Sequence, residues 1–147
     1  MDKVDVIIVG GGLAGLSCAY ELADSGMMVI VLERGDFSGS KNVTGGRIYV
    51  APLRDYLPAD IWKEGPLERH VTKEILTLMG ETNSTTLELY SDRFNREPYP
   101  SYTILRAKFD RWLADLISEK GVFVIPQKTA DDLIKDGQKI IGVRTGD

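Results

Sequence analysis

A glycine-rich turn near the N-terminus constrains this chain more than any other feature. Val4 and residues 6–9 form an apolar run that is rich in β-branched side chains and stops at Gly10, as expected of a buried strand in a parallel sheet. Residues 13–25 carry apolar side chains at helical spacing and precede Gly26, which predicts a helix that ends there. Residues 28–32 form a second apolar run that predicts another buried strand. The turn therefore lies inside a predicted βαβ unit.

The turn reads Gly10-x-Gly12-x-x-Gly15, and each glycine has its own physical reason. Gly10 permits a tight turn, Gly12 leaves room for a pyrophosphate against the backbone, and Gly15 lets the helix pack closely on the strand. The N–H groups and the positive dipole end of the helix then face the phosphates. Glu33 ends the second strand, about 20 residues further on, where an acid accepts hydrogen bonds from a ribose 2′-hydroxyl. The pattern predicts a Rossmann-like dinucleotide site, and Glu33 disfavours NADP because it would repel a 2′-phosphate.

Composition narrows the class of protein further. The chain has 147 residues, enough for one domain with a real core, and its net charge of −4 gives no indication of a nucleic-acid partner. Cys18 is the only cysteine, so no internal disulfide can form, and a reducing cytoplasm fits. We expect Cys18 to be a small buried residue rather than a redox thiol. No apolar run approaches the roughly 20 residues of a membrane span, and the N-terminus lacks the features of a signal peptide.

The remaining elements are predicted from local pattern. Residues 36–48 are rich in glycine and serine and predict a loop, and residues 91–100 predict another. A short helix with irregular flanks is predicted over residues 50–62, and a hairpin pairs residues 73–79 with 85–90. A strand at 102–105, an amphipathic helix at 107–120, a buried strand at 122–125 and a hairpin around Asp136-Gly137 follow. In the second helix, Phe109, Trp112 and Leu116 are predicted core residues, and His70 is expected to have a structural role.

The order of these elements indicates the start of a larger domain. A βαβ unit, a second helix–strand pair and a hairpin belong to a doubly wound sheet whose usual further strands and closing helix are missing. We therefore expect residues 1–147 to be the N-terminal part of an α/β dinucleotide-binding domain. Within it, residues 50–100 would begin an inserted substrate or β region.

Three stretches together resemble one family. They are the glycine turn with Glu33-Arg34 behind it, GSKNVTGGRIY at residues 39–49, and LRAKFDRWLADLISEKG at residues 105–121. The chain is similar over essentially its whole length to the FixC family of flavoproteins, relatives of electron-transfer-flavoprotein:quinone oxidoreductase within the wider geranylgeranyl reductase group. The stretch Lys41 to Gly46 is the part most specific to FixC. The resemblance implies a Rossmann-like FAD-binding fold of the glutathione-reductase type, with a small β insertion.

The resemblance also implies a cofactor and a set of residues that bind it. The nucleotide would be FAD, with its pyrophosphate held at Gly10, Gly12, Leu13, Ala14 and Gly15. Glu33 would bind the adenosine ribose, Arg34 would lie beside the adenine, and the backbone of Ala130 would meet the adenine. Arg106 would reach the phosphate and ribose region, and Lys41, Asn42, Gly45 and Gly46 would approach the flavin side. Family members are about three times longer than this chain, as expected of a multi-part flavoenzyme.

The residues themselves identify no general base, nucleophile or metal site, which is consistent with chemistry carried by a flavin. By resemblance, an electron-transfer flavoprotein passes electrons to FAD, and they leave to a ferredoxin-like protein or a quinone. One cysteine cannot hold an iron–sulfur cluster, which needs about four thiolates. The expected location is the cytoplasm or the periphery of the inner membrane. Three alternatives stay open: a geranylgeranyl-reductase-like flavoprotein, an NAD-binding module of another kind, and an inactive dinucleotide-binding fragment.

Overall fold

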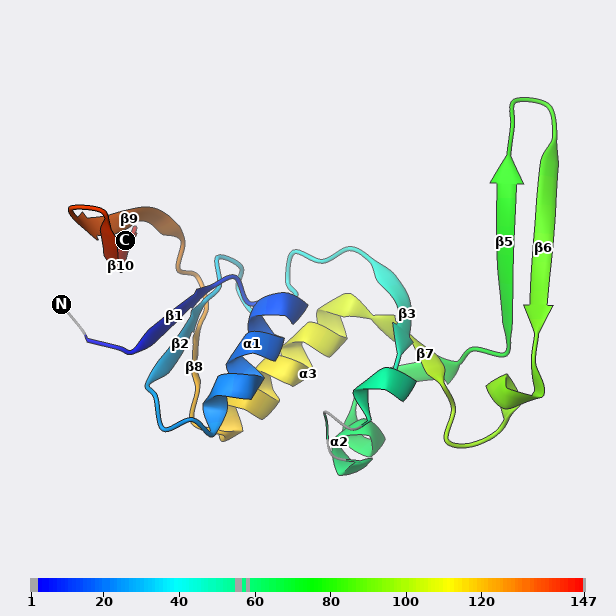
Figure 1. Ribbon diagram of the computed structural model, residues 1–147, viewed down its shortest axis with the longest axis horizontal. Helices are drawn as coiled ribbons and strands as arrows, with labels where there is room; N and C mark the ends of the chain where they lie inside the picture. The colour runs from blue at the N-terminus through cyan, green and yellow to red at the C-terminus, as the bar shows by residue number, and fades with distance from the viewer. Residues whose placement is uncertain (1–2, 55–56, 58, 147) are drawn as a thin grey trace. The chain divides into compact units, whose positions relative to one another are not determined.

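The computed structural model describes residues 3–54, 57 and 59–146 (Figure 1). The chain divides into two compact units. The first unit comprises Met1–Thr44 and Arg106–Asp147, and the second unit comprises Gly45–Leu105. The second unit contains the predicted 50–100 region.

A parallel sheet with two helices forms the centre of the first unit. Its strands are β1 (Val6–Val9), β2 (Val29–Leu32) and β8 (Phe123–Ile125), in the order β1-β2-β8. Helix α1 (Leu13–Ala23) connects β1 to β2, and α3 (Arg106–Glu119) precedes β8. The predicted βαβ unit is confirmed, because β1 pairs with β2 in parallel and β2 pairs with β8 in parallel.

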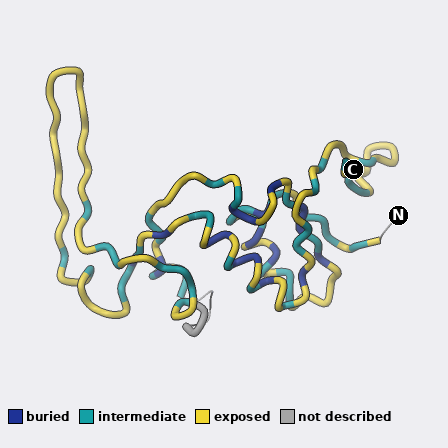
Figure 2. The backbone as a smooth tube through the Cα atoms, turned by 180° about the vertical axis from the view of Figure 1, so that it is seen from behind, coloured by how far each residue is buried: buried dark blue, intermediate teal, exposed yellow. Residues whose placement is uncertain are grey.

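The core of the first unit lies between the two helices and the central strand (Figure 2). Leu16 of α1, Val31 of β2 and Ile117 of α3 are completely buried. Phe109 is also buried, and the partly buried Trp112 and Leu116 pack against the core cluster, which confirms the predicted core face of α3. Burying an aliphatic side chain of this size contributes about 1.5–3 kcal/mol, so these contacts hold the sheet and helices together.

Two of the three predicted buried strands are less buried than expected. Strand β1 begins only at Val6, and its last residue, Val9, is 59% exposed. Phe123, the first residue of β8, is 61% exposed. A parallel sheet buries its strands only when both of its faces are covered. Within the part of the chain that the structure describes, the core side chains gather on one face, so β1 and β8 are partly exposed edge strands.

The first unit ends in a hairpin of β9 (Ala130–Asp136) and β10 (Lys139–Thr145). The hairpin was predicted, but its turn is centred one residue later than Asp136-Gly137. Asp136 pairs with Lys139, and Gly137 takes the first turn position with a φ of +59°. Glycine adopts this left-handed conformation without the penalty that other residues incur.

The second unit is built from antiparallel strands. A three-stranded sheet has the order β3-β7-β4, with β3 (Gly45–Tyr49), β7 (Ser101–Leu105) and β4 (Leu67–His70). Strands β5 (Lys73–Met79) and β6 (Ser84–Tyr90) form the predicted hairpin, which Figure 2 shows exposed along its length. Short helical segments η1 (Ala51–Leu53), α2 (Ala59–Glu64) and η2 (Asp92–Asn95) complete the unit.

Several predictions for the second unit were wrong. Residues 45–48, predicted as loop, belong to β3, and β4 was not predicted at all. The helix expected over residues 50–62 is two separate segments, η1 and α2, although residues 55, 56 and 58 lie outside the described part. Pro52 fits the first turn of η1, where a missing N–H is harmless. Strands β3 and β4 are both held by pairing with β7, a tertiary interaction that local propensity does not record.

Candidate functional site

The glycine turn has the three local properties that its spacing predicts. Gly10 has a φ of +105°, which turns the chain sharply at the end of β1. A Cβ on Gly15 would lie 2.0 Å from the carbonyl oxygen of Gly10, so only glycine allows this approach of α1 to the strand. At Gly12 no described atom lies within 4 Å of an added Cβ. The backbone therefore borders open space at the position predicted for a pyrophosphate.

Helix α1 begins at this turn with donors available for an anion. Gly12 is its N-cap residue and supplies no side-chain acceptor to the first turn. The first N–H groups of a helix have no partner within the helix, and the helix dipole makes this end positive. Leu13, Ala14 and Gly15 form the first turn, at the place where the sequence predicts phosphate oxygens.

Glu33 lies directly beside the turn. Its carboxylate accepts hydrogen bonds from the backbone N–H of Gly11 at 2.8 Å and of Gly35 at 2.6 Å. The backbone N–H of Glu33 donates to Ile125 of β8, and its carbonyl oxygen accepts from Lys128. These bonds fix the acid at the carboxyl end of β2. A carboxylate has about four acceptor positions, so a ribose hydroxyl can still bind it.

Two adjoining pockets bring most of the predicted cofactor residues together. One, of about 320 Å³, is lined by Val9, Gly10, Leu32, Glu33, Arg34, Lys128, Thr129 and Ala130. The other, of about 170 Å³, is lined by Gly12, Glu33, Arg34, Gly39, Lys41 and Asn42. Glu33 and Arg34 line both. Sequence reasoning missed Gly39, Lys128 and Thr129, although Gly39 lies in the resembling stretch and Lys128 and Thr129 directly precede Ala130.

Arg106 lines neither pocket and instead pairs with Asp110. Its Nε donates to Oδ1 of Asp110 and its Nη2 donates to Oδ2, both at 3.0 Å. Asp110 is completely buried and also accepts a 2.6 Å hydrogen bond from the side-chain amide of Asn42. Sequence reasoning gave Asp110 no role. The available signal was the spacing of Arg106 and Asp110 on one helix face, four residues apart.

Gly45 and Gly46 belong to the second unit, where they open β3. A Cβ on Gly45 would lie 2.9 Å from the carbonyl oxygen of Ile104, whereas nothing lies near one on Gly46. Gly45 therefore permits close pairing of β3 with β7, and Gly46 presents bare backbone. Their predicted approach to the flavin stays a prediction.

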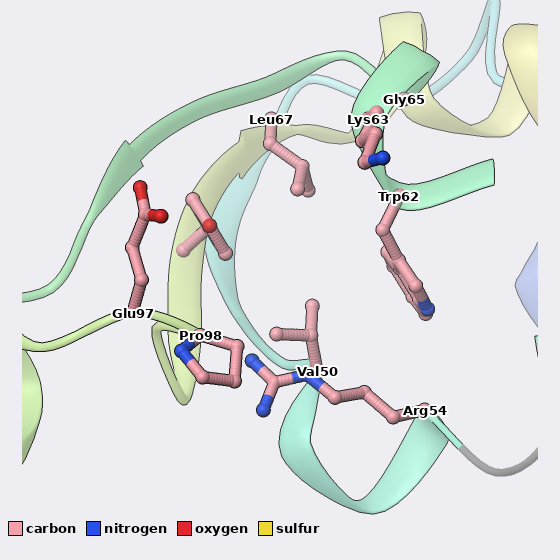
Figure 3. Close-up of a pocket in the computed structure, with 9 residues that line it drawn as sticks. Val50, Arg54, Trp62, Lys63, Gly65, Leu67, Glu97 and Pro98 are labelled. Atoms are coloured by element: carbon pink, nitrogen blue, oxygen red, sulfur yellow. The ribbon is translucent and has the colours of Figure 1, made fainter. Parts of the chain in front are cut away.

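The second unit contains a pocket of its own, of about 610 Å³ (Figure 3). Val50, Leu67 and Pro98 supply apolar surface, and Arg54 places its guanidinium among them. Tyr102 also lines the pocket. Burial, followed by the nearby Glu97 carboxylate, raises the pKa of the Tyr102 hydroxyl above its ordinary value of 10.0.

The surroundings of His70 and Cys18 can be compared with what the sequence predicts for each. His70 stacks on Tyr99 with 4.0 Å between ring centroids, in keeping with the structural role expected of it. Cys18 is exposed, so the expectation that it is buried was wrong. It falls on the side of α1 away from Leu16 and Ala19, the two residues that enter the core.

The described residues contain neither a cluster arranged to bind a metal ion nor a helix suited to span a membrane. No group of three or more histidine, cysteine, aspartate or glutamate side chains there is arranged to hold a metal ion. No helix in residues 3–54, 57 and 59–146 is both long and apolar enough to cross a bilayer.

Comparison with known proteins gives a family match. Residues 5–103 match the family model described as FAD dependent oxidoreductase. Protein FixC of Rhizobium meliloti is 41% identical over 145 residues, which cover 98% of this chain and 33% of that protein. A probable electron transfer flavoprotein-quinone oxidoreductase of Escherichia coli is 38% identical over 146 residues, covering 99% and 34%. The chain thus spans about a third of the length of the curated relatives it matches.

A solved structure agrees with the fold. The geranylgeranyl bacteriochlorophyll reductase-like protein of Thermoplasma acidophilum matches with a TM-score of 0.78 and 25% identity. The match covers 99% of this chain and 35% of that one. The predicted resemblance to FixC and to the wider reductase group is confirmed at this level, and so is the Rossmann-like FAD-binding fold.

Proposed function

The chain belongs to the family of FAD-dependent oxidoreductases, and we propose that it supplies the dinucleotide-binding part of a FixC-type electron-transfer flavoprotein. The observation that carries the proposal is the meeting of two pockets at Glu33 and Arg34, with Gly10 lining one and Gly12 the other. The cofactor of the family is FAD, so the alternative of an NAD-binding module of another kind finds no support in the comparisons.

The residues around these pockets fit an adenine dinucleotide. Open space lies against Gly12, and the first turn of α1 offers N–H groups to the pyrophosphate. Glu33 offers acceptors to ribose hydroxyls, and Lys41 and Arg34 add positive charge. When bound, FAD supplies the redox chemistry, and the protein binds and orients it.

Each predicted site residue has a proposed part in binding. The pyrophosphate is held at Gly10, Gly12, Leu13, Ala14 and Gly15, the adenosine ribose at Glu33, and the adenine beside Arg34 and the backbone of Ala130. Arg106 serves the phosphate and ribose region, and its guanidinium suits a fork of acceptors. On the flavin side we place Lys41, Asn42, Gly45 and Gly46.

We further propose that the electron donor is an electron-transfer flavoprotein and that the acceptor is a ferredoxin-like protein or a quinone. Support comes from the relatives, one of which is named as a probable electron transfer flavoprotein-quinone oxidoreductase. Anaerobic mixing of the FAD-loaded chain with reduced electron-transfer flavoprotein tests the donor. Because the donor's own flavin is oxidised as this one is reduced, the two proteins are separated anaerobically after mixing. The chain should then carry reduced flavin and the donor oxidised flavin, with NADH as a slow control. A flavin that dithionite reduces but reduced electron-transfer flavoprotein does not would overturn the donor assignment.

Two alternatives stand beside this proposal. The likeness to the geranylgeranyl bacteriochlorophyll reductase-like structure favours reduction of an isoprenoid alkene, which product analysis with reduced flavin would detect. The other alternative is a dinucleotide-binding fragment without activity of its own. Tight binding of FAD that neither reduced electron-transfer flavoprotein nor NADH reduces would support the fragment.

A further inference from the structure

We propose that Asp110 is the positioning residue of the dinucleotide site. Its carboxylate holds two groups in place beside the pocket that Gly12 lines. One is the loop that follows Glu33, and the other is the Arg106 guanidinium. The ligand assigned to that pocket rests on the proposed function, whereas the contacts of Asp110 do not.

Asp110 is a buried acid with two hydrogen-bonding partners, Arg106 and Asn42. It is completely buried on α3, where an unpaired carboxylate would be strongly unfavourable. Arg106 satisfies both of its oxygens through a bidentate pair at 3.0 Å, and Asn42 adds the third hydrogen bond at 2.6 Å. Both partners were predicted as cofactor ligands, so one buried acid connects two residues of the proposed site.

The same acid lies against the backbone of the loop. Gly39 has a φ of +93°, and a Cβ on it would lie 2.9 Å from the Cβ of Asp110. The backbone N–H of Asn42 donates to Gly39, and that of Arg106 donates to Thr44. Gly39 and Asn42 line the 170 Å³ pocket with Gly12, whereas Asp110 does not line it. Asp110 thus acts through the wall of the pocket and not by touching what the pocket holds.

The bidentate pair also presets Arg106 for an anion. Two of the five guanidinium N–H groups bind Asp110, and the remaining three have no acceptor among the residues that the structure describes. The Arg106 side chain is 28% exposed, so these donors can be reached from solvent. A guanidinium fixed in one plane loses less rotamer freedom when it binds than a free one does. The ligand class that matches is the adenosine diphosphate portion of a dinucleotide.

The first test needs no ligand. Asp110→Leu removes all three hydrogen bonds, and Asp115→Asn on the same helix is the exposed control. Amide hydrogen exchange on the full chain should show about tenfold faster exchange at residues 40 and 42 in Asp110→Leu, with β2 unchanged. Unchanged exchange at residues 40 and 42, or faster exchange throughout the unit in every Asp110 variant, would overturn the proposal. If Asp110→Leu does not fold, Asp110→Ala, which removes the same three hydrogen bonds, provides the same comparison.

The second test separates positioning from a general structural defect. Asp110→Asn keeps the side-chain shape and can still bond Asn42, but it offers Arg106 only one acceptor and no charge. Its affinity for ADP and for FAD should fall by the same factor, about tenfold, because a charge-assisted bidentate pair is lost. The double variant with Arg106→Gln should bind no more weakly than Arg106→Gln alone. If the two substitutions lower the affinity additively, the proposal is overturned. A wild-type chain that binds neither ADP nor FAD would refute the proposed function. The hydrogen-exchange result would then decide on Asp110 alone.

Discussion

Gly12 and Gly15 show how neighbouring glycines serve different ends. A side chain at Gly15 would collide with the backbone of Gly10, at 2.0 Å, so this residue is required by the fold. A side chain at Gly12 would enter open space, so this residue is not required by the fold and leaves room for a ligand. The two roles predict opposite results when each glycine is replaced.

Gly15→Ala should destabilise the protein by about 2–4 kcal/mol, because neither α1 nor the turn can move aside without losing packing. Gly12→Ala should cost no more than about 1 kcal/mol, because Gly12 is an N-cap residue with ordinary backbone angles. The free energy of unfolding, measured in urea for both variants, gives the comparison. Equal losses of unfolding free energy in the two variants would contradict the close approach of Gly15 to the backbone of Gly10.

Tyr102 makes the second unit sensitive to alkaline pH. Burial, and then the Glu97 carboxylate, raise the pKa of its hydroxyl above 10.0 in the folded protein. The folded state then holds the phenolic proton more tightly than the unfolded state does. Its contribution to stability is therefore fully present below about pH 10 and is lost as the pH rises through the folded pKa.

The expected result is a steeper loss of stability above pH 10.0 in the wild type than in Tyr102→Phe. Glu97→Gln should move the pKa of Tyr102 part of the way back, because Glu97 is the second cause of the shift. Subtracting the ultraviolet titration of Tyr102→Phe from that of the wild type isolates this hydroxyl among the six tyrosines. A difference curve with a midpoint below pH 10.0 would contradict the assignment.

At the level of elements, the sequence predicts those whose pattern is local. The helices α1 and α3, the strand β2 and both hairpins follow from periodicity and turn residues. Strand β3 was missed because it opens with two glycines, and β4 because its four residues are mostly polar. Both depend on a partner distant in the sequence.

The same distinction between local patterns and distant contacts separates the predicted residues of the candidate site from the missed one. The glycine turn and Glu33 were found because the spacing that defines them is short and regular. Asp110 was missed because one of its two partners, Asn42, lies 68 residues away along the chain. A buried acid looks like an ordinary surface residue of an amphipathic helix until the fold places both partners around it.

The β5–β6 hairpin gathers four leucines on one of its faces. Its register places Leu76 opposite Leu87, with Leu78 and Leu89 on the same face, and all four side chains are more than half exposed. The other face carries Ile75, Met79 and Tyr90 beside the Lys73–Glu88 ion pair and the Thr77–Thr86 hydrogen bond. Exposed apolar surface of this kind is a liability for self-association.

Replacing Leu76 and Leu87 by threonine should reduce self-association, because it removes the centre of this leucine cluster. Stability should change by no more than about 0.5 kcal/mol per site, since the positions are exposed and threonine suits a strand. Ile117→Ala is the matched core change and should cost about 2–5 kcal/mol. Sedimentation velocity and urea unfolding provide the readouts. If the double variant self-associates as much as the wild type, another surface causes the self-association.

At the scale of the whole chain, the two units differ in how much of their apolar side-chain surface is buried. The first unit has a packed core of residues from α1, β2, α3 and Val122, and the proposed dinucleotide site lies at the carboxyl ends of its strands. This is where ligands bind in open α/β sheets. In the second unit, the exposed large apolar side chains lie mostly on the β5–β6 hairpin. The relatives are about three times as long as this chain.

The most direct measurement is the visible absorbance spectrum of the full chain after FAD is added and unbound ligand is removed. The wild type should retain a flavin spectrum, and a folded Gly12→Val variant should not, because the valine side chain fills the space against the turn. Gly142→Ala is the matched control, because its Cβ would make only ordinary contacts with Ile134. A folded wild type without flavin, or a Gly12→Val variant that retains as much as the wild type, would contradict the account.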